Sequence, residues 1–167
     1  MTVAVLQDAG RIALAKSLAA LPAYFAWGRG DSAWVVPPAV PSNRTALLDE
    51  VGRRLVTTTR YVLPATAQDV DTVVIGKGAD KKYYKFSADP TPWLYLRTEF
   101  DTDDAEGEDI RECALFFGTV AKAGVPAGQR YLTPEQLQDA GFIYHLTYRS
   151  KATREGQKAN EEAVIPL

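Results

Sequence analysis

The chain has 167 residues, of which 46% are hydrophobic and 24% are charged, and its formal net charge is −2. This length suits one domain with a single sizeable core, and the composition excludes an intrinsically disordered chain. Because the charges nearly balance, we expect no extended basic surface and no nucleic acid partner.

Cys113 is the only cysteine, which excludes a disulfide within the chain and a metal site built from several cysteines. A single thiol also favours a reducing cytoplasm as the place of synthesis. Residues 1–8 lack the basic and apolar regions of a secretory signal, and charged or polar residues interrupt every apolar run short of the roughly 20 residues that cross a bilayer. We therefore expect a soluble protein with no membrane partner.

An amphipathic helix is predicted over residues 6–21, because Leu14, Leu18 and Leu21 recur at helical spacing and Pro22 then ends the pattern. The many alanines of this segment would let another backbone approach closely, so we expect the helix to pack on a sheet or against a second copy. The short apolar run over residues 24–27 predicts a strand.

Residues 28–43 contain two glycines and three prolines, a composition that favours an extended surface loop. A loop of this length in a compact domain is usually functional. Trp34, Val35 and Val36 give it apolar surface, and we expect Trp34 to act as an anchor on a neighbouring protein.

A short helix is predicted over residues 45–51, with Ser42 or Asn43 as its cap and Gly52 at its end. A strand follows over residues 53–62, where β-branched residues alternate between two faces. A second short helix is predicted over residues 133–138, where a threonine cap precedes proline. Further strands are predicted over residues 72–75, 83–86, 93–100, 110–120 and 142–148.

These elements predict an α+β fold, in which an N-terminal helix packs on a mostly antiparallel sheet or sandwich and short extra helices are added. We expect residues 1–150 to form a single domain. Residues 150–162 are polar and charged, and only residues 163–167 could add a last strand. Residues 151–167 are therefore predicted to form a polar tail that a partner orders.

Few residues suit catalysis, and we expect no enzyme and no cofactor. His145 is the only histidine, and both His145 and Cys113 lie in strand-like runs where a buried side chain is the ordinary outcome. A small hydrolase that uses His145 and the acidic residues 101–109 is the weakest alternative. Residues 76–82 lack the spacing of a phosphate loop and predict a hairpin connection with a basic tip.

The acidic stretch of residues 101–109 partly follows the order of ligands in a calcium-binding loop, but Ala105 and Glu106 stand where a ligand and the turn glycine belong. A solvated turn between strands is the expected structure, and incidental cation binding or docking of a basic partner are its alternatives. We predict no metal site. Residues 28–31 include the tripeptide of cell-adhesion ligands, and we expect an ordinary turn there.

Four short segments, in the same order along the chain, carry a resemblance to a known family. They are Ala9-Gly10-Arg11 with Ala13-Leu14-Ala15, then residues 26–31 (Ala-Trp-Gly-Arg-Gly-Asp), residues 45–54 (Thr-Ala-Leu-Leu-Asp-Glu-Val-Gly-Arg-Arg) and residues 108–116 (Glu-Asp-Ile-Arg-Glu-Cys-Ala-Leu-Phe). Together they resemble the N-terminal region of tail-collar fibre and baseplate-associated proteins of tailed bacteriophages. Asp49 stands where that family usually has asparagine, and Cys113 where it has glycine.

The resemblance implies a structural virion protein of a phage tail, assembled in the host cytoplasm. Because no fibre shaft or repeat follows the motifs, it favours a baseplate component, or an adaptor between baseplate and tail fibres, over a host-recognising tip. Its partners would be other tail, baseplate or fibre proteins and further copies of itself. A carbohydrate- or receptor-binding module of a tail fibre is the alternative. The candidate interface residues are Arg29, Asp31, Trp34, Val35, Val36, Arg53 and Arg54.

Overall fold

The structure, a computed structural model, describes residues 4–167; residues 1–3, at the start of the domain predicted over residues 1–150, lie outside the described part. The chain divides into two compact units, each built from separate stretches of sequence. The first unit comprises residues 4–21, 57–97 and 162–167, and the second comprises residues 22–56 and 98–161. This division differs from the boundary at residue 150 that the sequence predicts.

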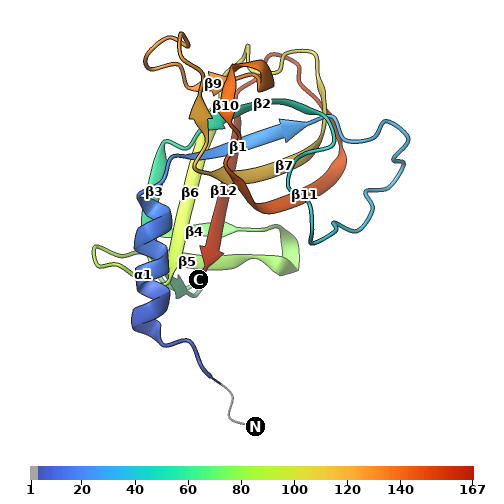
Figure 1. The fold of residues 1–167 in the computed structure, drawn as a ribbon. Helices are drawn as coiled ribbons and strands as arrows, with labels where there is room; N and C mark the ends of the chain where they lie inside the picture. Colours follow the sequence, from blue (N-terminus) through green and yellow to red (C-terminus); the bar gives the residue numbers. More distant parts are fainter. Residues whose placement is uncertain (1–3) are drawn as a thin grey trace. The chain divides into compact units, whose positions relative to one another are not determined.

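The first unit combines one α-helix with a sheet of strand order β12-β6-β3-β5-β4 (Figure 1). Strands β6 and β12 begin in one unit and end in the other. The pairings of β3 with β5 and β6, and of β4 with β5, are antiparallel. The elements are α1 (Asp8–Ala19), β3 (Thr58–Ala65), β4 (Thr72–Ile75), the 3-10 helix η1 (Gly78–Asp80), β5 (Lys82–Phe86), β6 (Trp93–Phe100) and β12 (Ala159–Pro166).

Helix α1 confirms the predicted helix but is not packed along an apolar stripe. Asp8 lies in its first turn and Lys16 in its last turn, where each charge complements the helix dipole. Ala15 is its only buried residue, and Leu14 is 49% exposed. The helix therefore leaves much of its apolar surface accessible.

One face of the sheet in the first unit forms a small core. Val62, Tyr84 and Tyr95 are buried there, on three neighbouring strands, and Val73 and Trp93 pack against them. The registers explain this grouping, since Tyr84 lies opposite Val73 on β4 and side chains of directly paired residues share a face.

The second unit is built on a five-stranded sheet of order β11-β7-β1-β2-β9. All six residues of β1 are buried, as are eight of the nine residues of β7, including the charged Arg111 and Glu112. Two short strands, β8 and β10, pair separately. The strands are β1 (Ala23–Gly28), β2 (Glu50–Leu55), β7 (Asp109–Phe117), β8 (Val120–Ala121), β9 (Tyr131–Leu132), β10 (Leu137–Asp139) and β11 (Phe142–Thr153).

The helix predicted over residues 45–51 is wrong. This stretch is irregular up to Asp49, and β2 begins at Glu50. The cause lies elsewhere in the chain: the backbone N–H groups of Leu48 and Asp49 donate to the carboxylate of Glu112 on β7, at 3.0 and 3.4 Å, instead of to a helical carbonyl. Leu47 is at the same time drawn into the core.

Three further elements differ from the prediction. The strand expected over residues 53–62 is divided, because β2 ends at Leu55 in the second unit and β3 begins at Thr58 in the first. The helix expected over residues 133–138 is a single 3-10 turn, η2 (Pro134–Gln136), with the predicted cap provided by Thr133. The stretch expected to be a polar tail contains the end of β11 and all of β12, which starts at Ala159.

The predicted α+β fold class is therefore corrected, because the described part of the chain has fewer helices than expected. The predicted antiparallel sheets are confirmed, but among residues 4–167 the helical content is α1 and two 3-10 turns, so the protein is β-rich with a single α-helix.

Candidate interaction surfaces

The long connection between β1 and β2, residues 29–49, is fixed at its base by Arg29. The Arg29 guanidinium donates two hydrogen bonds to Glu108, at 2.6 and 2.7 Å, and one to Asp49 at 3.0 Å. These acidic partners raise the pKa of Arg29, and the hydrogen bonds from Arg29 lower the pKa of Glu108. The bidentate pair with Glu108 fixes the direction of the Arg29 side chain as well as its distance. Because Arg29 begins the loop and Asp49 ends it, the hydrogen bond between them holds the two ends together. Arg29, an interface candidate, has this positioning role within the chain.

Trp34 packs on its own chain. Its ring lies against Tyr148 on β11, with 4.6 Å between the ring centroids, and the side chain is partly buried. Asp31 shapes the turn before it, because its carboxylate accepts the Ala33 N–H and its carbonyl accepts the Trp34 N–H. Gly30 has a positive φ of 61°, and a Cβ there would lie 2.8 Å from the Trp34 ring. Trp34 and Asp31 thus organise the loop around Tyr148.

Val35 and Val36 are the exposed apolar residues of this loop. Val35 is 95% exposed and Val36 is 76% exposed, directly after the packed Trp34 ring. The prolines at 37, 38 and 41 follow in backbone without turns or bends. Adjacent large apolar side chains held out from a fixed loop are typical of a protein interaction site. Figure 1 shows the loop extending outward from the second unit.

Arg53 and Arg54 lie in the interior of the second unit, which corrects their predicted interface role. Arg53 is 1% exposed and donates to Glu50, to Thr119 and to the carbonyl of Ala140, with its guanidinium 4.0 Å from the centroid of the Phe116 ring. Arg54 forms ion pairs with two acids of the turn after β6, Asp101 and Asp104. Because Arg53 and Arg54 are buried and have partners within the chain, they are not available to a neighbouring protein.

The acidic stretch of residues 101–109 is largely part of the same internal network. Asp104 is buried against Arg54, and Arg154 donates to the carbonyl of Asp101 at 3.0 Å. Over residues 4–167, no group of three or more His, Cys, Asp or Glu side chains is placed to hold a metal ion. Asp101, Asp104 and Glu108 are therefore accounted for by ion pairs to arginine.

Trp27 lies at the centre of another buried group in the second unit. Its indole N–H donates to Glu161 at 2.7 Å, and its ring stacks on Phe100 with 3.5 Å between centroids. Glu161 also accepts from Arg149 at 2.8 Å, and the Arg154 guanidinium lies 4.7 Å from the Trp27 ring centroid. These contacts tie the start of β12 to β1 and β11.

Cys113 is buried on β7, and His145 is partly buried on the neighbouring strand β11. Burial raises the pKa of the Cys113 thiol well above its ordinary value, and the nearby carboxylate of Glu161 raises it further. Burial also lowers the pKa of His145. A nucleophilic cysteine needs a lowered pKa and access to solvent, and Cys113 has neither.

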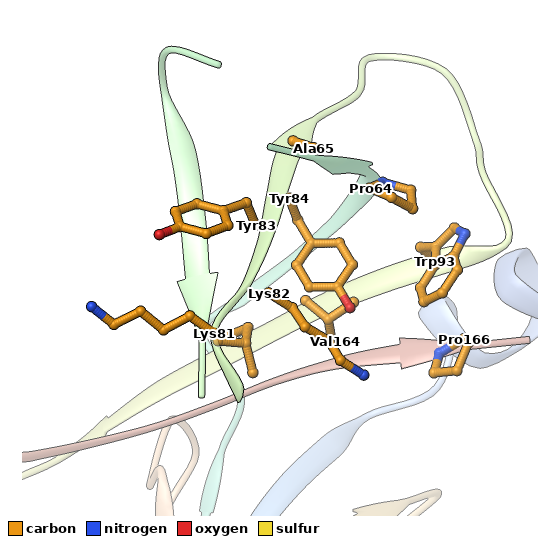
Figure 2. Close-up of a pocket in the computed structure, with 10 residues that line it drawn as sticks. Pro64, Ala65, Lys81, Lys82, Tyr83, Tyr84, Trp93, Val164 and Pro166 are labelled. Atoms are coloured by element: carbon orange, nitrogen blue, oxygen red, sulfur yellow. The ribbon is translucent and has the colours of Figure 1, made fainter. Parts of the chain in front are cut away.

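The first unit contains a pocket of about 590 Å³ that sequence analysis did not predict. In Figure 2, the rings of Tyr84 and Trp93 lie near Val164 and Pro166. The Tyr84 and Trp93 centroids are 5.8 Å apart, and the rings are tilted by 46°. The adjoining lysines and tyrosines at 81–84 are the longest part of this pocket that is contiguous in the sequence. Trp93 and Val164 join them only when the chain folds. We call this the aromatic pocket; its lining comprises Pro64, Ala65, Ile75, Lys81, Lys82, Tyr83, Tyr84, Trp93, Val164 and Pro166.

Among residues 4–167, no helix is long and apolar enough to span a membrane. Comparison with known proteins finds no match among curated sequences. Residues 3–167 match the family model described as "Baseplate wedge 3 tail fiber network component". This match confirms the resemblance to baseplate and fibre proteins of tailed phages and implies a location in the virion tail. The chain therefore belongs to the family of baseplate wedge 3 tail fibre network components, structural proteins of the phage baseplate.

Proposed function

We propose that this protein is a multicopy adaptor, which joins the baseplate to tail fibres through protein–protein contacts. The observation that carries the proposal is the exposed pair Val35–Val36 on a loop whose base is fixed by Arg29. Exposed apolar surface is costly in water, and a rigid loop that presents it loses little entropy when a partner covers it. Apolar contact at these two valines, with a neighbouring baseplate or fibre protein or with a further copy of the chain, is the expected mode of attachment.

The same proposal assigns the protein no catalytic role. His145 and Cys113 are the side chains of the types best suited to acid–base or nucleophilic work, and burial opposes the charged form of each. Arg53 and Arg54, which could stabilise a developing negative charge, are paired with Glu50, Asp101 and Asp104. Assembly in the host cytoplasm agrees with the single buried thiol.

The proposal is tested by replacing the exposed valines and counting fibres on assembled virions. Val35→Asp combined with Val36→Asp is expected to give tails with fewer fibres, because charge at these positions opposes apolar contact. Val70→Asp is the matched control, since Val70 is 82% exposed but belongs to the first unit. The readouts are fibre number by electron microscopy and fibre protein per tail by mass spectrometry. A full set of fibres on the double variant would contradict the proposal.

A further inference from the structure

The aromatic pocket is built to take an apolar, proline-rich chain. The buried Tyr84 and the partly exposed Trp93 provide two tilted rings, and Val164 and Pro166 line the pocket beside them. Trp93 is held in place by its backbone, whose N–H donates to the hydroxyl of Thr91 at 3.2 Å, and that hydroxyl in turn donates to the carbonyl of Val62 at 2.6 Å. Grooves lined by fixed aromatic rings are the common receptors for polyproline II segments.

One side of the pocket is positively charged. Lys82 lies opposite Ile75 in the register of β4 and β5, which places its side chain on the same face as Tyr84. Lys81 precedes the strand and also lines the pocket. An occupant with an acidic residue beside its apolar part would therefore be favoured.

Residues 35–41 of this chain, Val-Val-Pro-Pro-Ala-Val-Pro, have the matching chemistry. Pro37, Pro38 and Pro41 fix their own φ angles, and residues 37–41 run without turns or bends after the backbone bends at Val35 and Val36. The proline part of the segment is therefore prearranged in extended, polyproline II-like backbone at little entropic cost. Four residues of such a helix span about 12 Å. The segment is exposed at both valines, and the acidic Asp31 precedes it on the same loop. We call residues 35–41 the proline segment.

We infer that the aromatic pocket of one copy of this protein binds the proline segment of a second copy. The valines and prolines lie against Tyr84, Trp93 and Pro166, and Asp31 lies near the lysines of the pocket rim. This inference rests on the proposed function and names one of the contacts through which the multicopy adaptor assembles.

The pocket and the segment are different surfaces, so the contact is heterologous: each copy offers one of each. Repetition of such a contact gives a closed ring where the rotation between copies permits, and an open chain of subunits otherwise. Both are suited to a network that links several positions around a baseplate. A single contact of this size is weak, and it gains strength from repetition within the assembly.

A labelled synthetic peptide of residues 31–41 tests the contact directly, by fluorescence anisotropy with the full chain. We expect saturable binding that Trp93→Ala weakens about tenfold or more, because an aromatic anchor is lost. A peptide carrying Pro37→Ala and Pro38→Ala is expected to bind more weakly, since it loses its prearranged backbone. Thermal unfolding checks that Trp93→Ala still folds.

Two lysine variants keep the test decisive if Trp93→Ala does not fold. Lys82→Glu reverses charge inside the pocket, and we expect it to weaken peptide binding several-fold at low salt and less at high salt. Lys85→Glu is the matched control on the same strand, because Lys85 lies opposite Leu63 and faces away from the pocket. Equal loss of binding for both lysine variants would overturn the assignment of the pocket.

Mixing variants tests whether two copies are joined. Light scattering is expected to show larger assemblies for the wild type, and smaller species for Val35→Asp alone and for Lys82→Glu alone. A mixture of the two variants retains one intact contact and should give mixed dimers. The mass of a monomer at every protein concentration, with peptide still bound, would overturn the second copy as occupant.

The remaining outcomes separate this inference from the proposed function. A lack of saturable peptide binding would overturn the inference. Binding of an anionic glycan to the wild type that is lost in Trp93→Ala would also overturn it. In both cases the adaptor role is still tested by the fibre count on virions. Normal fibres on virions of the double valine variant, with peptide binding intact, would contradict the adaptor role alone.

Discussion

The buried carboxylate of Glu112 accepts the backbone N–H of Leu48 at 3.0 Å, across 64 residues of sequence. Glu112 is fully buried on β7, and the same carboxylate also accepts the N–H of Asp49. The second end of the long loop is therefore held by a side chain from β7, an interior strand of the sheet. This contact determines where the loop ends and where β2 begins.

Glu112→Ala is expected to lower the free energy of unfolding by about 2–3 kcal/mol, because two buried N–H groups would lose their acceptor. Chemical denaturation monitored by circular dichroism measures the change. Glu106→Ala is the control: Glu106 is an exposed acid of the neighbouring turn, and its removal should change stability by less than about 0.5 kcal/mol. Similar effects from both substitutions would show that Glu112 does not hold the loop.

Gly30→Ala is expected to destabilise the loop more than Gly124→Ala does. Both glycines have positive φ, so alanine costs about 1–2 kcal/mol at either position. A Cβ on Gly30 would also lie 2.8 Å from the Trp34 ring, whereas a Cβ on Gly124 meets open space. Denaturation gives the stability difference, and near-ultraviolet circular dichroism reports the packing of Trp34. Unchanged aromatic signals in Gly30→Ala would contradict this packing.

The ion pair between Arg29 and Glu108 makes the loop sensitive to acid. The hydrogen bond from Arg29 lowers the pKa of Glu108, so its stabilisation is fully present above the unfolded value of about 4.3 and is lost as pH falls through the lowered folded value. The stability difference between wild type and Glu108→Gln should therefore be constant near neutral pH and shrink below about pH 4. Denaturation curves between pH 7 and 3 would measure it, and a difference that grows on acidification would refute the pairing.

Glu161→Ala is expected to destabilise the second unit by about 1–3 kcal/mol, because it leaves both the Trp27 indole N–H and Arg149 without this acceptor. The exposed Glu155 provides a control substitution. Tryptophan fluorescence during denaturation follows the change, and a midpoint equal to that of Glu155→Ala would contradict the role of Glu161.

The thiol of Cys113 should react slowly with a disulfide reagent in the folded protein and quickly after unfolding. Burial holds its pKa well above the ordinary value, so little thiolate is present near neutral pH. Release of the reagent's chromophore, with and without denaturant, measures both rates. Rapid reaction of the native protein would reopen the question of a functional thiol.

Local sequence signals predicted most strands and the helix before Pro22, because alternation and proline act over a few residues. The helix expected at 45–51 failed because its N–H groups bind Glu112, a partner that the local pattern cannot reveal. Arg53 and Arg54 were expected at an interface for the same reason, since their acidic and carbonyl partners come from other parts of the chain.

The candidate sites were predicted unevenly. The exposed valines follow from the length and apolar content of a proline-rich loop, and the sequence shows both. The aromatic pocket was missed because β5, β6 and β12 bring Tyr84, Trp93 and Val164 together from distant parts of the sequence. The packing of Trp34 on Tyr148 depends on a similarly distant strand.

The most direct measurement is a cryo-electron microscopy map of the intact tail at a resolution that traces side chains. We expect several copies of this protein at the baseplate, with Val35 and Val36 of each copy covered by a neighbouring protein. A baseplate in which both valines face solvent in every copy would contradict it.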